Sequence, residues 1–193
     1  MVNDKQEDSQ DLEQQELNLD DSGTLNTLSP KLPEIKQVSR VQLEMEFRDP
    51  SGETQTVGAS STVWPAEVII GSKVASSWVA KNQPVEVDFI SVNQQQQLQP
   101  NTPIKIIGQM VRYESHRKRT LGGYYSYDTK TIKEPVAVNC GSQTDAQGHL
   151  RCQFNFAKAG ELELTAISTD KAGRQAATHT SLWVAGDDEW WFE

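Results

Sequence analysis

The stretch that decides the fold runs from Pro135 to Phe156 and reads PVAVNCGSQTDAQGHLRCQFNF. Apolar residues take every second position on both sides of a turn: Val136, Val138 and Cys140 before it, and Cys152, Phe154 and Phe156 after it. Such alternation is typical of strands with one buried face. Between them, Asp145 can bond the backbone ahead of it and Gly148 tolerates a positive φ. The pattern predicts a β-hairpin.

A second stretch follows the same plan, from Glu161 to Gly186, and reads ELELTAISTDKAGRQAATHTSLWVAG. Leu162, Leu164 and Ala166 alternate before an Asp-Lys-Ala-Gly turn, and a Thr/Ala/Ser-rich strand then ends at Trp183. Two hairpins cannot bury both of their apolar faces alone. We therefore expect a facing sheet, as in a β-sandwich.

An earlier part of the chain repeats this second hairpin. Residues 43–64, LEMEFRDPSGETQTVGASSTVW, match residues 162–183, LELTAISTDKAGRQAATHTSLW, apart from a two-residue difference between turn and tryptophan. The spacing of the copies is about that of one sandwich domain. The chain is thus expected to hold the end of one domain and the whole of a second.

This repeat and the composition suggest four segments. Low hydrophobicity and high charge predict a disordered, acidic, Gln-rich segment at the N-terminus. The expected order is residues 1–36 as that segment, 37–72 as terminal strands of a truncated domain, 73–187 as a complete β-sandwich, and 188–193 as an aromatic junction to a following domain.

Further alternating runs complete the predicted sandwich. Val85, Val87 and Phe89 form one run, and the next begins at Ile104 and Ile106. Residues 114–131 are interpreted as a polar connection or an edge hairpin with its bend at Gly122-Gly123. About seven strands result, and no convincing long amphipathic helix is seen. We predict an all-β, immunoglobulin-like or fibronectin-like sandwich.

The net charge and the distribution of apolar residues limit the classes of function. The 193 residues carry a net charge of −9, which argues against binding nucleic acid. No apolar run is long enough to cross a membrane. The N-terminus is acidic and polar, unlike a signal peptide.

The two cysteines, Cys140 and Cys152, are the only site that the sequence suggests. Folding the predicted hairpin about Ala146 brings them opposite each other, close enough for a disulfide. Two buried free thiols are the alternative, and the disulfide is favoured. A disulfide implies an oxidising compartment, which conflicts with the lack of a secretion signal in this chain.

Other constellations indicate little chemistry. The three histidines, His116, His149 and His179, lack metal-ligand spacing. The chain has no Gly-rich phosphate loop, no nucleophile elbow and no close carboxylate pair. We therefore predict no catalytic residue, no cofactor and no metal, and the protein is not expected to be an enzyme.

Two aromatic features remain. The segment Arg112–Arg119 is locally basic and is followed by Tyr124, Tyr125 and Tyr127. Interleaved bases and aromatics can bind nucleic acid or polysaccharide, but the overall acidity opposes this, so a solvated connecting hairpin is favoured. Near the ends of the predicted strands stand three tryptophans that are candidates for core or inter-domain packing: Trp64, Trp78 and Trp183.

Several of these motifs occur together and in order: GGYYSYDTKT at 122–131, the paired cysteines, the D-x-A-G turn at 170–173, and WVAGDDEWWF at 183–192. In this combination the chain resembles the bacterial alpha-2-macroglobulin family, over roughly Val38 to Phe192. The resemblance is to the macroglobulin-like domain before the bait region, with the end of the preceding domain.

The resemblance implies a scaffold fragment of a periplasmic or cell-envelope endopeptidase inhibitor that traps proteases. Family members are cut in a bait region, and many capture the protease through a C-x-E-Q thioester. This chain contains no C-x-E-Q and no bait region, so only the cysteine pair carries over, as a structural feature.

The implied partners are other macroglobulin domains or a split partner chain, and proteases only in the full-length protein. A membrane would be reached only through an anchor missing here. The alternative is a stand-alone β-sandwich module that binds cell-wall glycan, through the tyrosines near Gly122-Gly123, or a protein partner.

Overall fold

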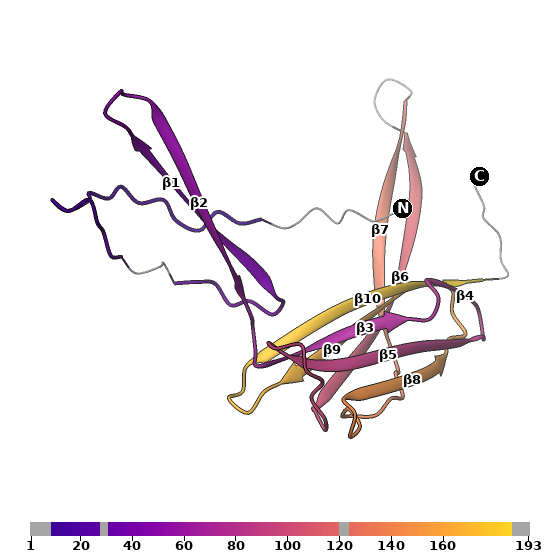
Figure 1. Ribbon diagram of the computed structural model, residues 1–193. Helices are drawn as coiled ribbons and strands as arrows, with labels where there is room; N and C mark the ends of the chain where they lie inside the picture. Colours follow the sequence, from indigo (N-terminus) through magenta and orange to yellow (C-terminus); the bar gives the residue numbers. More distant parts are fainter. Residues whose placement is uncertain (1–8, 28–30, 120–123, 187–193) are drawn as a thin grey trace. The chain divides into compact units, whose positions relative to one another are not determined.

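The computed structural model describes residues 9–27, 31–119 and 124–186 (Figure 1). By its internal contacts the chain divides into two units, Met1–Ile35 and Lys36–Glu193. The described part of the first unit contains neither helix nor strand and has one turn, around Asp20 to Gly23.

All regular structure of the described residues is β, in ten strands. The strands are β1 (Ser39–Arg48), β2 (Thr54–Val63), β3 (Val68–Val74), β4 (Trp78–Ala80), β5 (Pro84–Asn93), β6 (Ile104–Arg119), β7 (Tyr125–Val136), β8 (His149–Asn155), β9 (Gly160–Thr169) and β10 (Gln175–Ala185). No helix long and apolar enough to span a membrane is found in the ranges that the structure describes. The all-β prediction is confirmed.

Eight of the strands form a β-sandwich. One layer has the order β4-β10-β9-β6-β7 and the other has the order β3-β5-β8. Neighbouring strands are antiparallel except β4 and β10, which are parallel. The sequence predicts about seven strands, and the described part of the sandwich has eight.

The core lies between the two sheets and uses the alternation seen in the sequence. Val85, Val87 and Phe89 of β5 are each 1% exposed, and Leu164 of β9 is likewise 1% exposed. The two layers meet through one cluster: Ile70, Val85, Val87, Phe89, Ile104, Met110, Leu150, Cys152, Phe154, Phe156, Leu162, Leu164, Ala166, Leu182 and Val184. The interdigitated inner faces give the sandwich its stability.

The repeat seen in the sequence is also present in the structure. β1 and β2 pair from Arg48 opposite Thr54, and β9 and β10 pair from Thr169 opposite Gln175, which is the same register relative to each turn. Both turns end in a glycine with positive φ, 86° and 80°. The two hairpins thus have one design.

The predicted hairpin from Pro135 to Phe156 is wrong in its pairing. β7 pairs with β6 in the five-stranded sheet, whereas β8 pairs with β5 in the other sheet. The connection between β7 and β8 crosses from one layer to the other, and the hydroxyl of Thr144 on it accepts a 2.9 Å hydrogen bond from the N–H of Thr102. Alternation reports which face of a strand is buried, and both strands do face the core, but it does not identify the partner strand.

The sandwich also begins earlier than the expected boundary between residues 72 and 73. β3 starts at Val68 and pairs along its whole length with β5. Just before it, Ala66 is 1% exposed, and the N–H of Glu67 donates to Asp170 Oδ2 at 3.1 Å. The strand was missed because its apolar run is short and follows directly on the preceding hairpin. The expected junction at 188–193 lies outside the described residues.

Candidate interaction surfaces and the disulfide

The β1–β2 hairpin carries an apolar face that the described chain leaves exposed. Leu43, Met45 and Phe47 of β1 are 68%, 47% and 43% exposed, and Val57, which pairs with Met45, is 49% exposed. These four residues, Leu43, Met45, Phe47 and Val57, are called the hairpin face below. In the matching hairpin, Leu164 is 1% exposed.

This difference in exposure is informative because the two hairpins share one register. The face of β9–β10 is covered by the sheet β3-β5-β8 and is bordered by β6. β1 pairs with β2 and with no other described strand, so its second edge offers unpaired backbone groups. Such an edge beside an apolar face is suited to accept further strands.

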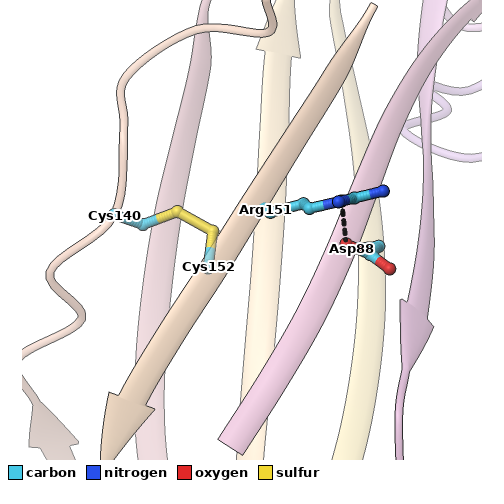
Figure 2. Close-up of a disulfide and its surroundings, with 4 residues drawn as sticks. All are labelled: Asp88, Cys140, Arg151 and Cys152. Atoms are coloured by element: carbon cyan, nitrogen blue, oxygen red, sulfur yellow. Dashed lines mark ion pairs between the residues drawn. A yellow bond between two sulfur atoms is a disulfide. The ribbon is translucent and has the colours of Figure 1, made fainter.

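The two cysteines form a disulfide in the structure (Figure 2). Cys140 lies on the connection after β7, and Cys152 lies on β8, with their Cα atoms 5.3 Å apart. Cys152 is 4% exposed and belongs to the core, and Cys140 packs partly buried against it. β7 and β8 are edge strands of the two different sheets, so the bond joins the layers along one border of the sandwich.

The opposite side of β8 is polar. Arg151 points away from the disulfide and forms an ion pair with Asp88 of β5 at 3.3 Å (Figure 2). Both side chains are largely exposed, so this pair contributes little stability. The local sequence R-C in β8 thus separates a solvent-facing charge from a core cysteine.

The β6–β7 ribbon extends beyond the sandwich as a two-stranded arm (Figure 1). β6 pairs with β9 only from Ile104 to Val111, whereas its pairing with β7 continues to Arg119 opposite Tyr125. The sequence allowed either a polar connection or an edge hairpin here, and the structure has the latter over the described residues. Its expected bend at Gly122-Gly123 lies outside them.

Side chains at odd positions of both strands share one face of the arm. The hydroxyls of Ser115 and Thr129 lie 3.2 Å apart, and the guanidinium of Arg117 stacks 3.6 Å from the ring centroid of Tyr125. Tyr125 and Tyr127 are 52% and 67% exposed. The sequence indicated these bases and tyrosines but not that they alternate across two strands.

Ion pairs and hydrogen bonds fix the base of the arm. Glu134 accepts from Arg112 at 2.5 Å and from Lys158 at 2.7 Å, and these two donors, Lys158 first, hold the pKa of its carboxyl below the ordinary value. Tyr113 donates its hydroxyl to Glu161 at 3.0 Å, which raises the pKa of the phenol. The arm is therefore anchored to the sheet by polar contacts on both of its faces.

The remaining predicted residues do not assemble into a site. His116 lies on the arm, His149 begins β8, and His179 on β10 has its Nδ1 2.9 Å from the hydroxyl of Thr165. Within the described ranges no group of His, Cys, Asp and Glu is arranged to hold a metal ion.

Two of the three tryptophans are on the surface. Trp78 and Trp183 are neighbours in β4 and β10 and are 56% and 37% exposed, so they do not pack in the core. Trp64 is half-buried. An open depression of about 290 Å³ lies where residues 36–38 cross β10, and it gathers no cluster of titratable groups.

Comparisons with known proteins show the fold of the sandwich. No protein-family model and no curated protein matches the sequence. Among solved structures, the alpha-2-macroglobulin of E. coli in its native conformation aligns with a TM-score of 0.50 at 12% identity, over 76% of this chain and 10% of that one.

The Salmonella alpha-2-macroglobulin reacted with methylamine aligns with a TM-score of 0.49 at 13% identity, over 75% of this chain and 10% of that one. Spo0M, a sporulation control protein of Bacillus subtilis, aligns with a TM-score of only 0.32 at 10% identity, over 62% and 49% of the two chains. The chain therefore spans about a tenth of the length of the macroglobulins that it resembles in fold.

Proposed function

We propose that this chain is a non-catalytic scaffold section of an alpha-2-macroglobulin-like endopeptidase inhibitor. The observation that carries the proposal is the repeated hairpin: a complete sandwich is preceded by a hairpin of the same register whose apolar face lacks a facing sheet. A piece of a longer chain of similar sandwich domains would contain this combination, namely one sandwich and the last hairpin of the sandwich before it. The fold similarity to the E. coli macroglobulin supports the choice of family.

The physical role of such a section is to hold its neighbours in place. Burying an apolar side chain contributes about 1.5–3 kcal/mol, so covering the hairpin face gives a neighbouring sheet a substantial reason to dock. The partners are accordingly other macroglobulin-like domains, on the same polypeptide or on a separate one. Proteases become partners only of that larger assembly.

The disulfide supports a location in the periplasm or cell envelope. Disulfides form and persist in oxidising compartments and are rare in the cytosol. Intact mass of the protein purified from its native compartment, with and without reductant, checks this part. Two free thiols in that protein would contradict it.

The coding DNA on both sides of this reading frame tests the proposal itself. We expect further sandwich-encoding sequence upstream, and a bait segment with a C-x-E-Q motif downstream. The isolated chain, mixed with trypsin, is expected to leave the cleavage of large protein substrates unchanged. Unrelated genes on both sides, or protection of large substrates by this chain alone, would overturn the proposal.

A further inference from the structure

The arm formed by β6 and β7 presents an uninterrupted row of aromatic rings and guanidinium groups. Arg117 lies opposite Tyr127 and Arg119 lies opposite Tyr125 in the register of the ribbon. Arg117 also stacks on the ring of Tyr125, which lies diagonally across the ribbon. We call Arg117, Arg119, Tyr125 and Tyr127 the arm ladder.

The guanidinium groups and the rings of the arm ladder are accessible to a ligand. No described carboxylate forms an ion pair with Arg117 or Arg119, although the base of the same arm is rich in such pairs. A guanidinium stacked on a ring keeps its edge N–H groups free to bind a carboxylate in two-point geometry. Both tyrosine rings are more than half exposed.

The arm is also cationic within an acidic protein. Residues 112–119 and 125–132, which pair with each other beyond the contact with β9, contain five Lys or Arg against two Asp or Glu, whereas the whole chain has a net charge of −9. The two acids, Glu114 and Asp128, occupy even positions, so the face that carries the ladder has none on the arm. The local field thus favours an anion over this one face.

From these observations we propose that the arm ladder binds a linear acidic polysaccharide, that is, a chain of uronic acids. Alternate residues of a strand are about 6.8 Å apart, so ring and guanidinium recur along the arm on the scale of a sugar unit. Each uronate offers an apolar C–H face to a tyrosine ring and a carboxylate to an arginine. This inference is independent of the scaffold role, because the arm lies away from the hairpin face in sequence and uses different residues.

Two other polyanions fit the ladder less well. Nucleic acid binding draws most of its affinity from many phosphate contacts, and the ladder has only two cations on a protein of net negative charge. An acidic polypeptide supplies carboxylates on flexible stems but no flat apolar face at each unit. The uronate chain is the ligand class that uses both halves of the ladder.

Isothermal titration calorimetry of the full chain with a polygalacturonate fraction tests the proposal. The comparison ligands are neutral cellohexaose, poly-L-glutamate and oligo-dT. We expect saturable binding to polygalacturonate, and about tenfold or more weaker binding to each of the others. Equal or tighter binding to poly-L-glutamate or oligo-dT, or no binding to polygalacturonate, would overturn the assignment.

Two double variants of equal charge decide whether the ladder is the site. Arg117→Gln with Arg119→Gln removes two cations from the ladder, and Lys118→Gln with Lys130→Gln removes two cations from the other face of the same arm. We expect the first pair to weaken binding about tenfold or more and the second pair by less than about threefold. Equal losses in both would show a general charge effect and refute the ladder.

A third variant tests the contribution of the tyrosine rings. Tyr125→Ala with Tyr127→Ala leaves the charge unchanged and is expected to reduce affinity by about tenfold, because the apolar face of each sugar then has no ring to pack on. All the substituted side chains are exposed, so the far-ultraviolet circular dichroism should match that of the parent. Unchanged affinity in the tyrosine variant would contradict the proposal.

Discussion

At the scale of single residues, equivalent positions of the two repeated hairpins have opposite environments. Leu164 of β9 is 1% exposed and lies in the core between the sheets. Leu43 of β1 takes the same place relative to its turn and is 68% exposed. The sequence pattern is the same around both leucines, because alternation marks the face of a strand that is suited to burial and not whether a covering sheet is present.

A pair of leucine truncations measures this difference. We expect Leu164→Ala to lower the free energy of unfolding by about 2–5 kcal/mol, through lost transfer energy and a cavity. Leu43→Ala should change it by less than about 0.5 kcal/mol, as for exposed sites. Urea denaturation followed by tryptophan fluorescence gives both values, and a cost above about 2 kcal/mol for Leu43→Ala would contradict the exposed hairpin face.

The turn aspartate Asp170 gives the sandwich a dependence on pH. Its carboxylate accepts from the backbone N–H groups of Glu67, Arg174 and Ala172 and from the guanidinium of Arg174, and the pKa is lowered to about 2, chiefly by Glu67. The ordinary value in an unfolded chain is about 3.9. The folded state therefore favours the ionised form.

The sign of the pH effect follows from that lowering. The stability contributed by Asp170 is fully present above about pH 4 and is lost as the pH falls through about 2. Asp170→Asn keeps an oxygen acceptor but cannot titrate, so its urea midpoint should fall less steeply over that range. Asp20→Asn, in an equivalent turn outside the sandwich, is the control and should follow the parent; equal slopes for all three proteins would contradict the role of Asp170.

One further turn, formed by residues 93–97, has the same hydrogen bonds as the turns that begin with aspartate. Asn93 accepts from the N–H groups of Gln95 and Gln97, the same pattern that Asp145 makes with Gln147 and His149. The place of the glycine is taken by Gln96 with a φ of 62°. This turn is hard to predict from the sequence, because its usual marker, a glycine, is absent.

At the scale of elements, the buried face of a strand and the identity of the strand that it pairs with are separate pieces of information. The alternating residues before and after the turn at Asp145–Gly148 do point into the core, as predicted. Their strands belong to different sheets, since the connection between them changes layer. Local pattern fixes the buried face; pairing depends on long-range contacts that no local signal encodes.

The disulfide acts on these two elements. It closes a span of 12 residues and joins an edge strand of one sheet to the continuation of an edge strand of the other. A loop of this size contributes about 2–3 kcal/mol, mainly by restricting the unfolded chain. We expect reductant to lower the free energy of unfolding by that amount.

The control is the double variant Cys140→Ala with Cys152→Ala, whose stability should be reduced and should no longer respond to reductant. Urea midpoints with and without reductant give the comparison. A parent protein whose stability is indifferent to reductant would show that the bond is absent or without effect.

At the scale of the whole molecule, a complete sandwich and an uncovered hairpin lie on one polypeptide. Exposed apolar strands with a free edge pair readily with other chains. We expect the protein to associate increasingly as its concentration rises in size-exclusion chromatography. Leu43→Glu with Met45→Glu should shift it toward monomer, because like charges then line the hairpin face.

The matched control places two glutamates on the other face of the same hairpin, Ser60→Glu with Thr62→Glu. This variant should associate about as strongly as the parent. Clean monomer for the parent at high concentration would count against the hairpin face as a docking surface.

Hydrogen–deuterium exchange of the full chain compares the two repeated hairpins within one molecule and so tests whether the first of them lacks a covering sheet. We expect fast exchange of the amides in residues 39–63 and slow, core-like exchange in residues 160–185. Equal, strong protection of both hairpins in the monomer would contradict an incomplete unit before a complete sandwich, and with it the scaffold assignment.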